Sequence, residues 1–533
     1  MVPGDCHVAS LLAMTIRYNW CDAESCKQQF FVLLDNGRWI CYNKQKIRKG
    51  DITLNTIKLA GLEPANVLGY FEEICSMPHG SGNTKIISDY LVNFAKAHDL
   101  KYIQDELNDV IIFVPGTCGM EDHEPVIIQG HMDMVCEQDP DCTIDMEREG
   151  LDITHDGNYI FAKGTTLGGD DGIAVAMAMA LAADRNIAHP PLELVITVDE
   201  ETGMFGAAGI DLSMLKGKML LNIDSEDEGI FTVSCAGGAR ATISVPFARK
   251  AVYGPAIRLV VDGLQSGHSG VEIHKNRANA NKVMGEFLRR IQEKMPLCLV
   301  SYGGGTKDNV ICYSCEAHAI ALGNDLEFIN EIAAQLQAEI RANYAEPTAS
   351  VQAYNAEALG GNALSQEDTA KAISLICAVP NSVQKMSRQI EGLVQTSLNL
   401  GVARLDENLR LTFSVRSSVN QEKEDLLQQL RDLAEAYQGN YSQMGEYPAW
   451  EYKEDSKLRD TMVEVYGKMY GKKAEVVAIH AGLECGLLGE KIEGLDAVSI
   501  GPEMHDIHTS RERLGIASVG RTWEFVLEVL KAL

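Results

Sequence analysis

A histidine and an aspartate lie two residues apart in this sequence, directly after an apolar run. His131 and Asp133 follow the run 126–129 in VIIQGHMDMV. On an extended chain, residues two apart lie on the same face. A neutral imidazole is a good zinc ligand, and a nearby carboxylate can orient it without binding the metal itself. Taken alone, the pair is better explained by an ordinary loop histidine.

Two adjacent carboxylates, Asp170 and Asp171, lie in the glycine-rich segment GTTLGGDDG, just before an expected helix. Adjacent carboxylates repel each other unless cations neutralise them. Capping of the helix by one aspartate is the competing interpretation. Capping explains one of the two side chains and leaves the other unexplained.

Further acids follow two other apolar runs. Asp199, Glu200 and Glu201 come directly after the run 192–198, and Asp224 comes directly after the run 219–223. Three acids at the exit of a buried strand cost free energy unless water or a metal ion surrounds them. A surface turn is the alternative interpretation of the triplet.

Two histidines, His505 and His508, lie near the C-terminus in the loop sequence SIGPEMHDIHTS. Together with the acids they form a mixed set of donors at strand ends, where ligand sites lie in α/β folds. Such sets suit zinc, cobalt or manganese. The number of donors predicts two ions, bridged by one carboxylate, with a free carboxylate acting as base on a shared water.

The elements that would position these residues follow one pattern. Short, continuously apolar runs are typical of strands buried on both faces: 110–114, 126–129, 192–198 and 219–223. Amphipathic or apolar stretches between them are typical of helices: 66–74, 85–98 and 172–184. This alternation predicts an α/β sheet covered by helices.

A segment of different character interrupts this pattern. It holds two similar strand–helix stretches, 257–294 and 395–437, which we interpret as a weak internal duplication. The α/β pattern returns with a helix at 457–470 and a strand at 474–479. The domains we expect are an N-terminal extension of unknown structure at 1–62, a catalytic domain in two parts at 63–237 and 447–533, and an inserted domain at 238–446.

Charge and composition exclude several classes of protein. The chain has 47 basic and 75 acidic residues, a net charge of −28, so nucleic acid and anionic membranes are not expected partners. Its longest apolar run, 173–183, is about half of the ~20 residues of a membrane span. No basic region precedes the first apolar stretch, as a secretory signal would require. The 14 scattered cysteines, with a single Cys-x-x-Cys at Cys312 and Cys315, favour a reducing cytoplasm.

Seven motifs carry a resemblance to a known family: HMDMV, GTTLGGDDG, DEETGM, NIDSEDEG, QSGHSGVEIH, IHAGLECG and SIGPEMHDIH. In this order they resemble the aminoacyl-histidine dipeptidases, also called Xaa-His dipeptidases or peptidase D, of the di-zinc dipeptidase and aminoacylase metallopeptidases. The resemblance covers residues 64–533. It implies a zinc-peptidase catalytic domain, with a mixed, largely parallel sheet flanked by helices, interrupted by an inserted α+β lid or dimerisation domain. It also implies hydrolysis of dipeptides, of the Xaa-His type such as β-Ala-His and others.

The resemblance also implies a role for each residue at the centre. The implied ligands of two divalent ions, zinc first and cobalt or manganese as alternatives, are His131, Asp170, Glu201, Asp224 and His508, with Asp170 as the bridge. Glu200 matches the general base and Asp133 the carboxylate behind the ligands. His268 matches the histidine of the inserted domain that stabilises the oxyanion after domain closure.

Three further residues match substrate-binding positions. Asn309 and Arg416 belong to the inserted domain, and a guanidinium is well shaped to hold a dipeptide's carboxylate. Glu484 matches a position that receives the substrate's ammonium group. The chain departs from the family after the last ligand, where Thr509 and Ser510 replace an expected Ser-Pro, so His505 stays a rival to His508. Residues 1–62 have no counterpart in the family pattern.

Two other functions stay open at this point. An aminoacylase or deacetylase would use the same metals on N-acyl amino acids and would not need Glu484. A non-catalytic peptide- or metal-binding protein would keep the fold but would be free to lose Glu200. In the wider group the inserted domain pairs two chains, and the oxyanion histidine can come from the neighbour, so a homodimer is compatible with the pattern.

Overall fold

The computed structural model describes residues 58–323, 325–344, 346–356 and 361–533, and three short strands before them. These strands, β1 (Tyr18–Asn19), β2 (Gln29–Leu33) and β3 (Trp39–Asn43), pair antiparallel in the order β1-β2-β3. They and Lys58 form a unit of their own, and Leu59–Leu533 form the second. The rest of the extension expected at 1–62, up to residue 57, lies outside the described residues.

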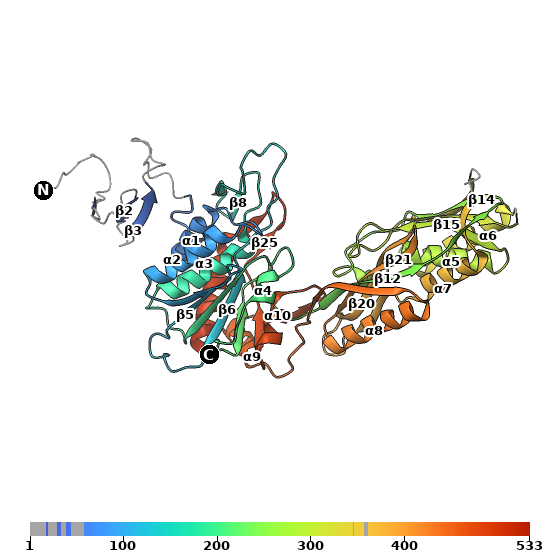
Figure 1. Ribbon diagram of the computed structural model, residues 1–533. Helices are drawn as coiled ribbons and strands as arrows, with labels where there is room; N and C mark the ends of the chain where they lie inside the picture. The colour runs from blue at the N-terminus through green and yellow to red at the C-terminus, as the bar shows by residue number, and fades with distance from the viewer. Residues whose placement is uncertain are drawn as a thin grey trace. The chain divides into compact units, whose positions relative to one another are not determined.

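An eight-stranded mixed sheet forms the centre of the first layered region (Figure 1). Its strands, in spatial order, are β23 (Glu475–Ile479), β11 (Ile230–Cys235), β24 (Asp496–Ser499), β10 (Met219–Asn222), β6 (Val126–His131), β9 (Leu192–Thr197), β5 (Val110–Val114) and β4 (Lys101–Gln104). The four strands β24, β10, β6 and β9 run parallel to one another. Their carboxyl ends therefore meet at one edge of the sheet.

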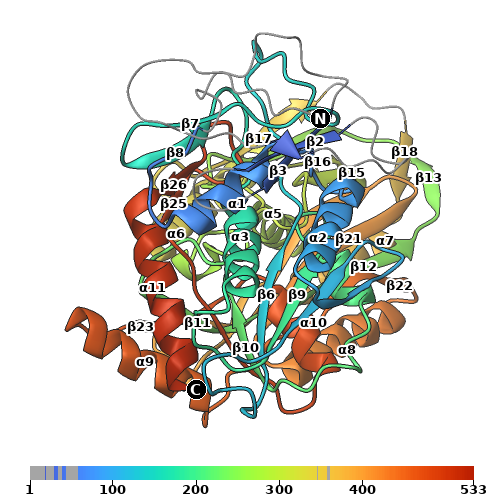
Figure 2. The ribbon, with the colours of Figure 1, turned by 90° about the vertical axis from the view of Figure 1, so that its left-hand side faces the viewer.

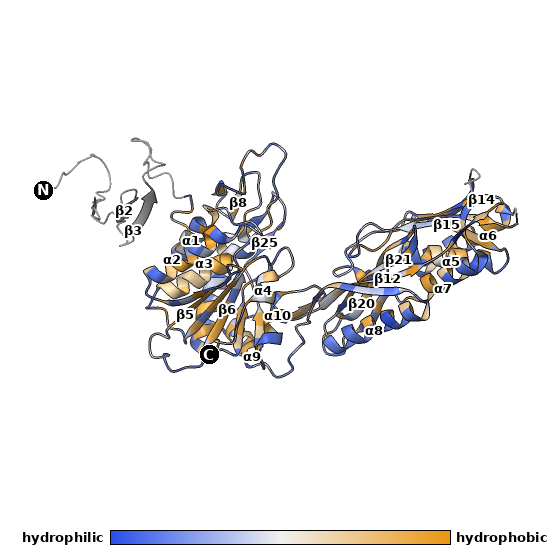
Figure 3. Cartoon of the chain, viewed as in Figure 1, coloured by the Kyte–Doolittle hydropathy of each residue, from blue (hydrophilic) through white to orange (hydrophobic). Residues whose placement is uncertain are grey.

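Helices cover both faces of this sheet because its strands are apolar on both sides. Successive residues of a strand point to opposite faces, so the neighbours Ile127 and Ile128 belong to two separate cores. The larger core includes α1 (Ala65–Cys75), α2 (Lys85–Ala97), α3 (Gly169–Ala183), α9 (Lys457–Tyr470) and α11 (Ile516–Ala532). The smaller core includes α4 (Phe205–Gly209) and α10 (Glu484–Lys491). Figure 2 shows α3 beside β6, and Figure 3 shows the apolar colouring of the central strands.

A nine-stranded antiparallel sheet forms the second layered region, within residues 237–447. Its strands, in order, are β17 (Ser350–Ala356), β14 (Ala256–Asp262), β16 (Cys315–Ala321), β15 (Leu297–Gly304), β20 (Val394–Leu405), β21 (Asn408–Ser417), β12 (Gly237–Pro246) and β22 (Asn440–Tyr447), with β19 (Ser382–Met386) paired to β20. Both stretches of the suspected duplication contribute strands to this one sheet.

One face of the second sheet carries helices and the other is polar. The packed helices are α5 (Ala280–Gln292), α6 (Leu326–Asn343), α7 (Gln366–Ala378) and α8 (Asn420–Ala436), which share one core with the strands. On β12 and β21, buried residues alternate with exposed ones such as Arg240 and Arg410. In the sequence, this α+β region is inserted between β11 and β23 of the α/β sheet. The arrangement confirms the fold class expected from the sequence.

Small elements complete the chain. β25 (Met504–His505), β26 (Arg513–Gly515), β8 (Tyr159–Ala162) and β7 (Ile153–His155) form a four-stranded sheet, and β13 (Arg249–Val252) pairs with β18 (Gly361–Leu364). Cys312 and Cys315 are buried and carry free thiols, in keeping with a structural role. Across the described residues, every helix is too short or too polar to cross a membrane.

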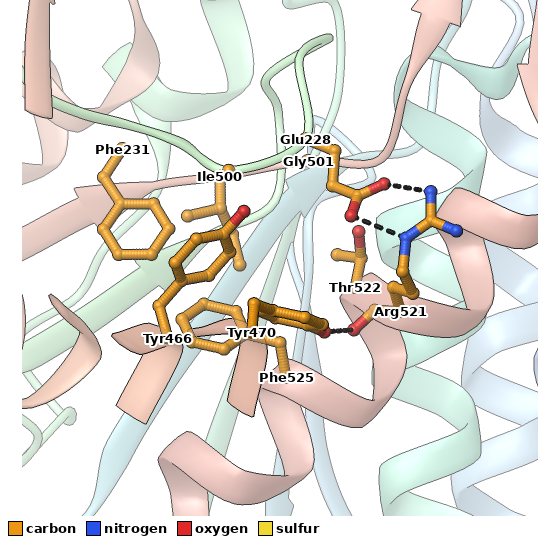
Figure 4. Close-up of a pocket in the computed structure, with 10 residues that line it drawn as sticks. Glu228, Phe231, Tyr466, Tyr470, Ile500, Gly501, Arg521, Thr522 and Phe525 are labelled. Atoms are coloured by element: carbon orange, nitrogen blue, oxygen red, sulfur yellow. Dashed lines mark hydrogen bonds and ion pairs between the residues drawn. The ribbon is translucent and has the colours of Figure 1, made fainter. Parts of the chain in front are cut away.

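A cavity between α9 and α11 is lined by stacked aromatic rings and by the ion pair of Glu228 with Arg521 (Figure 4). Its volume of about 10 Å³ gives room for roughly one water molecule. We therefore regard this cavity as part of the packing between the two helices.

Candidate metal centre

Six of the predicted residues lie together where the parallel strands end. Three groups of donors can each hold a metal ion: His131 with Glu200 and Glu201, His131 with Asp170 and Asp224, and Asp170 with Glu201 and His508. Within each group the ligand atoms lie within 4.8 Å of one another. β6 ends at His131, and the loops after β9 and β10 carry the glutamates and Asp224. The topology of the sheet thus explains why residues far apart in sequence meet.

Asp170 belongs to two of these groups, and each of its oxygens faces a different histidine. Its Oδ1 lies 3.2 Å from His131 Nε2, and its Oδ2 lies 3.2 Å from His508 Nε2. A carboxylate in this position is shaped to bridge two cations. The residue has φ −82° and ψ 103°, and Asp171 is also non-helical, so the helical part of α3 begins after them, near the expected residue 172.

The structure separates the two C-terminal histidines. His508 Nε2 lies 2.9 Å from Glu201 Oε1, whereas His505 Nε2 lies 2.8 Å from Glu503 Oε1 and belongs to none of the donor groups of the described residues. His508 has φ 58°, a left-handed conformation that is uncommon outside glycine. Such conformations gather at functional sites, where the surrounding structure maintains them.

Asp133 and Glu200 lie behind and beside the ligands. The Asp133 carboxylate lies 3.5 Å from His131 Nδ1, accepts the Ser81 hydroxyl at 2.8 Å, and accepts the backbone N–H of Glu200 at 3.2 Å. His131 Nδ1 also donates to the backbone carbonyl of Asp133 at 3.0 Å. Asp133 thus orients the imidazole through its carbonyl and its nearby carboxylate, and the carboxylate holds the start of the Glu200 loop. Ser81, in the loop SMPHGSGN, had not been singled out from the sequence.

The electrostatics of this cluster favour cations. Burial, reinforced by Asp224, raises the pKa of Glu200 to about 9, and burial raises the pKa of Asp224 to about 6. Hydrogen bonds to Asp170 and Glu201 raise the pKa of His508 to about 10. Carboxylates that repel one another in a buried place gain most from bound divalent ions, which invert these shifts. The donor set therefore fits metal ions of the kind that histidine and carboxylate bind.

Glu484 lies beneath the cluster and has 0% exposed surface. Its Oε2 accepts hydrogen bonds from Gln129 Nε2 and from Thr197 Oγ1, both at 2.6 Å, while its Oε1 has no partner among the described residues. Gln129 also accepts from Asn222 at 2.6 Å, so polar residues of β6, β9 and β10 join one network. The expected contact of Glu484 with an ammonium group therefore involves a completely buried carboxylate and stays a prediction.

The remaining predicted residues lie in the second layered region. His268 Nδ1 accepts the backbone N–H groups of Gly270 and Val271 at 3.2 and 3.3 Å, so its ring proton must be on Nε2. The backbone carbonyl of Asn309 accepts a hydrogen bond from the Ser269 N–H at 2.9 Å. None of the contacts made by the described part of the chain joins these residues, or Arg416, to the donor groups.

Arg416 has a guanidinium with spare hydrogen-bonding capacity. Its Nη1 donates to the Tyr447 hydroxyl at 3.2 Å, and its buried Nε has no partner in the described ranges. Burial, and then Arg416, lower the pKa of His480 to about 3, and His480 Nε2 lies 2.7 Å from Ser397 Oγ. His480 was not predicted as a functional residue, although it belongs to the motif IHAGLECG.

Asn309 also borders a hollow of about 590 Å³ on the polar face of the second sheet. Arg240 and Asp308, which line the hollow, form a bidentate ion pair with both N–O distances at 2.8 Å. Polar and charged groups therefore surround the position expected for substrate binding.

Comparison with known proteins gives one family. The profile described as Peptidase family M20/M25/M40 matches residues 127–532. The cytosol non-specific dipeptidase of Escherichia coli strain K12 is 34% identical over 482 residues, which are 89% of this chain and 99% of that protein. The structure of aminoacylhistidine dipeptidase from Vibrio alginolyticus has a TM-score of 0.84 at 33% identity and covers 89% of this chain and 98% of its own. The aminopeptidase PepT structure from Bacillus cereus, at 14% identity and a TM-score of 0.51, shares the fold.

Proposed function

This chain belongs to Peptidase family M20/M25/M40, and from that membership we propose that it hydrolyses dipeptides at a centre of two divalent metal ions. The substrates we propose include Xaa-His dipeptides such as β-Ala-His and extend beyond them. The observation that carries the proposal is the position of Asp170, which is shared by two donor groups and turns one oxygen toward each. The names of the two similar dipeptidases support the substrate class.

The proposed ligands are His131, Asp170, Glu201, Asp224 and His508. Zinc is the metal that we propose first, with cobalt and manganese as alternatives, because histidine and carboxylate donors suit all three. Held by these residues, two such cations would polarise the scissile carbonyl and lower the pKa of an attacking water.

Glu200 is the proposed general base. Bound cations nearby would lower the pKa of Glu200 from the value of about 9 that burial gives it, toward the ionised form that a base needs. Its carboxylate takes a proton from the water while the water oxygen forms a bond to the carbonyl carbon. The same proton then passes to the departing amine nitrogen as the C–N bond breaks. Asp133 keeps the His131 ring and the backbone of Glu200 in place.

The second layered region supplies the other proposed contacts. Burial and Arg416 lower the pKa of His268, so its ring is neutral at pH 7 and its Nε2–H can donate to the oxyanion. We propose that Arg416 and Asn309 bind the substrate's carboxylate, which the unpartnered Nε of Arg416 favours. Glu484 Oε1 is the proposed acceptor of the ammonium group.

Several other features stay proposals. The domains we propose are the extension 1–62, the catalytic domain at 63–237 and 447–533, and the inserted lid at 238–446. We also propose that the enzyme acts in the cytoplasm, as the name of the Escherichia coli relative suggests for that protein. In a homodimer, the partner's inserted domain is an alternative source of the oxyanion donor.

A substrate panel on metal-depleted protein tests the proposal. Chelated enzyme should be inactive, and restored zinc, cobalt or manganese should restore hydrolysis of β-Ala-His and other dipeptides. N-acyl amino acids provide the control, because an aminoacylase would prefer them. Faster release of amino acids from the N-acyl compounds would contradict the proposal, and binding of dipeptides without hydrolysis at any metal concentration would favour a binding protein.

A further inference from the structure

We infer that Glu512 is a positioning residue for the metal centre. Its buried carboxylate holds the turn that presents Asp170 and joins this turn to the segment that carries His508. The inference rests on the proposed function only in that metal ions bind at this centre.

The carboxylate of Glu512 accepts hydrogen bonds from four consecutive backbone N–H groups. Oε2 accepts from Leu167 at 2.7 Å and from Gly168 at 3.1 Å, and Oε1 accepts from Gly169 at 2.7 Å and from Asp170 at 3.4 Å. The side chain is only 3% exposed. Hydrogen bonds to an ionised acceptor are stronger than those between neutral groups. The fourth of these bonds is made by the proposed bridging ligand itself.

The turn needs an acceptor from elsewhere in the chain. The four N–H groups belong to the turn before the helical part of α3, and buried backbone N–H groups need an acceptor. The N-cap of α3 is Gly168, which has φ 69° and no side chain to cap them. Glu512 lies more than 340 residues away in sequence and supplies the missing acceptors. The left-handed glycine and a distant carboxylate therefore shape the turn together.

The space around the turn is filled, so it cannot reshape freely. A Cβ atom at Gly168 would approach Met134 Sδ to 2.9 Å and His79 Nε2 to 3.1 Å. A Cβ atom at Gly169 would approach Glu512 Oε1 to 3.2 Å. Glutamine at 512 would keep the shape of the side chain, but its NH₂ group would face two of the N–H donors. A shorter side chain would leave buried donors without acceptors, which is unfavourable.

The same residue fixes the C-terminal ligand. Glu512 lies four residues after His508, and its N–H donates to the Thr509 carbonyl at 3.1 Å, which closes a tight turn between them. His508 Nε2 in turn lies 3.2 Å from Asp170 Oδ2. Glu512 thus determines the separation of two ligands that come from opposite ends of the catalytic sequence, although it belongs to none of the donor groups of the described residues.

The test compares Glu512→Gln with Glu228→Gln in the full chain. Glu228 is a matched control because it accepts hydrogen bonds from Ser518 and Arg521 in the same part of the fold and has no contact with the turn. After removal of metals, Zn²⁺ binding is measured by competition with a chelator, and metal content is measured after dialysis. Loss of residues that support metal ligands typically weakens metal affinity 10- to 100-fold.

We expect Glu512→Gln to lose 10- to 100-fold in Zn²⁺ affinity and Glu228→Gln to keep wild-type affinity even where its melting temperature falls. If the Gln variant does not fold, Glu512→Asp takes its place, because it keeps the charge but cannot reach all four N–H groups. Wild-type affinity in the folded variant overturns the inference. Wild-type protein that binds Zn²⁺ tightly and hydrolyses no dipeptide would instead overturn the proposed function, without touching the role of Glu512.

Discussion

Substitution of the adjacent residues Glu200 and Glu201 by glutamine tests the proposed general base separately from a proposed metal ligand. The Glu201 carboxylate contacts His508, whereas Glu200 is held through its backbone N–H by Asp133. Glutamine has the same length as glutamate, so each substitution removes a charge and leaves the packing intact. We expect Glu200→Gln to keep both metal ions and lose turnover, and Glu201→Gln to lose metal.

The expected magnitude follows from the roles of the two carboxylates. A general base contributes about 100- to 10,000-fold in rate, which corresponds to about 3–5 kcal/mol of activation free energy. Because the base acts only in the transition state, kcat and kcat/KM should fall together and KM should stay unchanged. Glu201 belongs to two of the three donor groups, so its loss should lower the metal content from two ions toward one.

The assay needs two measurements on the same samples. Metal content per chain is determined by mass spectrometry after dialysis, and β-Ala-His hydrolysis is followed by release of the free amino acids over a range of added Zn²⁺. Turnover of Glu200→Gln within about ten-fold of wild type, below the range expected for a general base, would refute its role as base. Loss of a metal ion from the same variant would show that Glu200 is a ligand and that its neighbour must be reconsidered.

Three further predictions concern other residues. His508→Ala should lose one metal ion and His505→Ala should keep both, as measured by metal content; the opposite result would exchange their roles. Glu484→Gln should lower kcat/KM for dipeptides at least about ten-fold and leave kcat/KM for N-acyl amino acids unchanged. Equal losses for both substrates would show that Glu484 only forms internal hydrogen bonds and does not bind the ammonium group. Burial raises the pKa of Asp109 to about 8, so between about pH 4 and 8 the native state keeps a proton that the unfolded chain releases, and stability falls as pH rises, by up to about 1.4 kcal/mol per pH unit. Asp109→Asn should reduce the fall in melting temperature between pH 6 and pH 8; an unchanged pH dependence would contradict this.

The central strands could be predicted from the sequence because they are buried on both faces. The run 110–114 coincides with β5, and the runs that begin at Val126, Leu192 and Met219 mark β6, β9 and β10 to within two residues. An unbroken apolar run has one good explanation in an α/β fold. The helices 85–98 and 457–470 likewise match α2 and α9, because their apolar residues recur at helical spacing.

The donor residues could be named from the sequence, but their grouping could not. Position at strand ends identified a pool of acids and histidines, and the family pattern separated Glu200 from Glu201. That Asp170 faces two histidines depends on the backbone of its turn, which has no periodic signal. The turn depends on Glu512, and a contact over more than 340 residues leaves no local pattern.

Short polar contacts were also beyond the reach of sequence patterns. Ser81 and His480 are single residues in loops, and their partners come from distant segments. The burial of Glu484 was not expected either, because a glutamate at the start of a helix is usually solvent-exposed. Its burial follows from polar partners on β6 and β9, which compensate for the loss of water.

The position of β24 has a consequence for synthesis on the ribosome. β24 lies between β10 and β11, yet residues 236–495 are translated after those two strands and before it. At about 5–20 residues per second, this interval lasts on the order of tens of seconds. During that time β10 and β11 lack the strand that pairs with both of them. Unpaired strand edges can associate with other chains. Chaperones that shield such edges should therefore raise the yield of this protein most strongly in the last part of its translation.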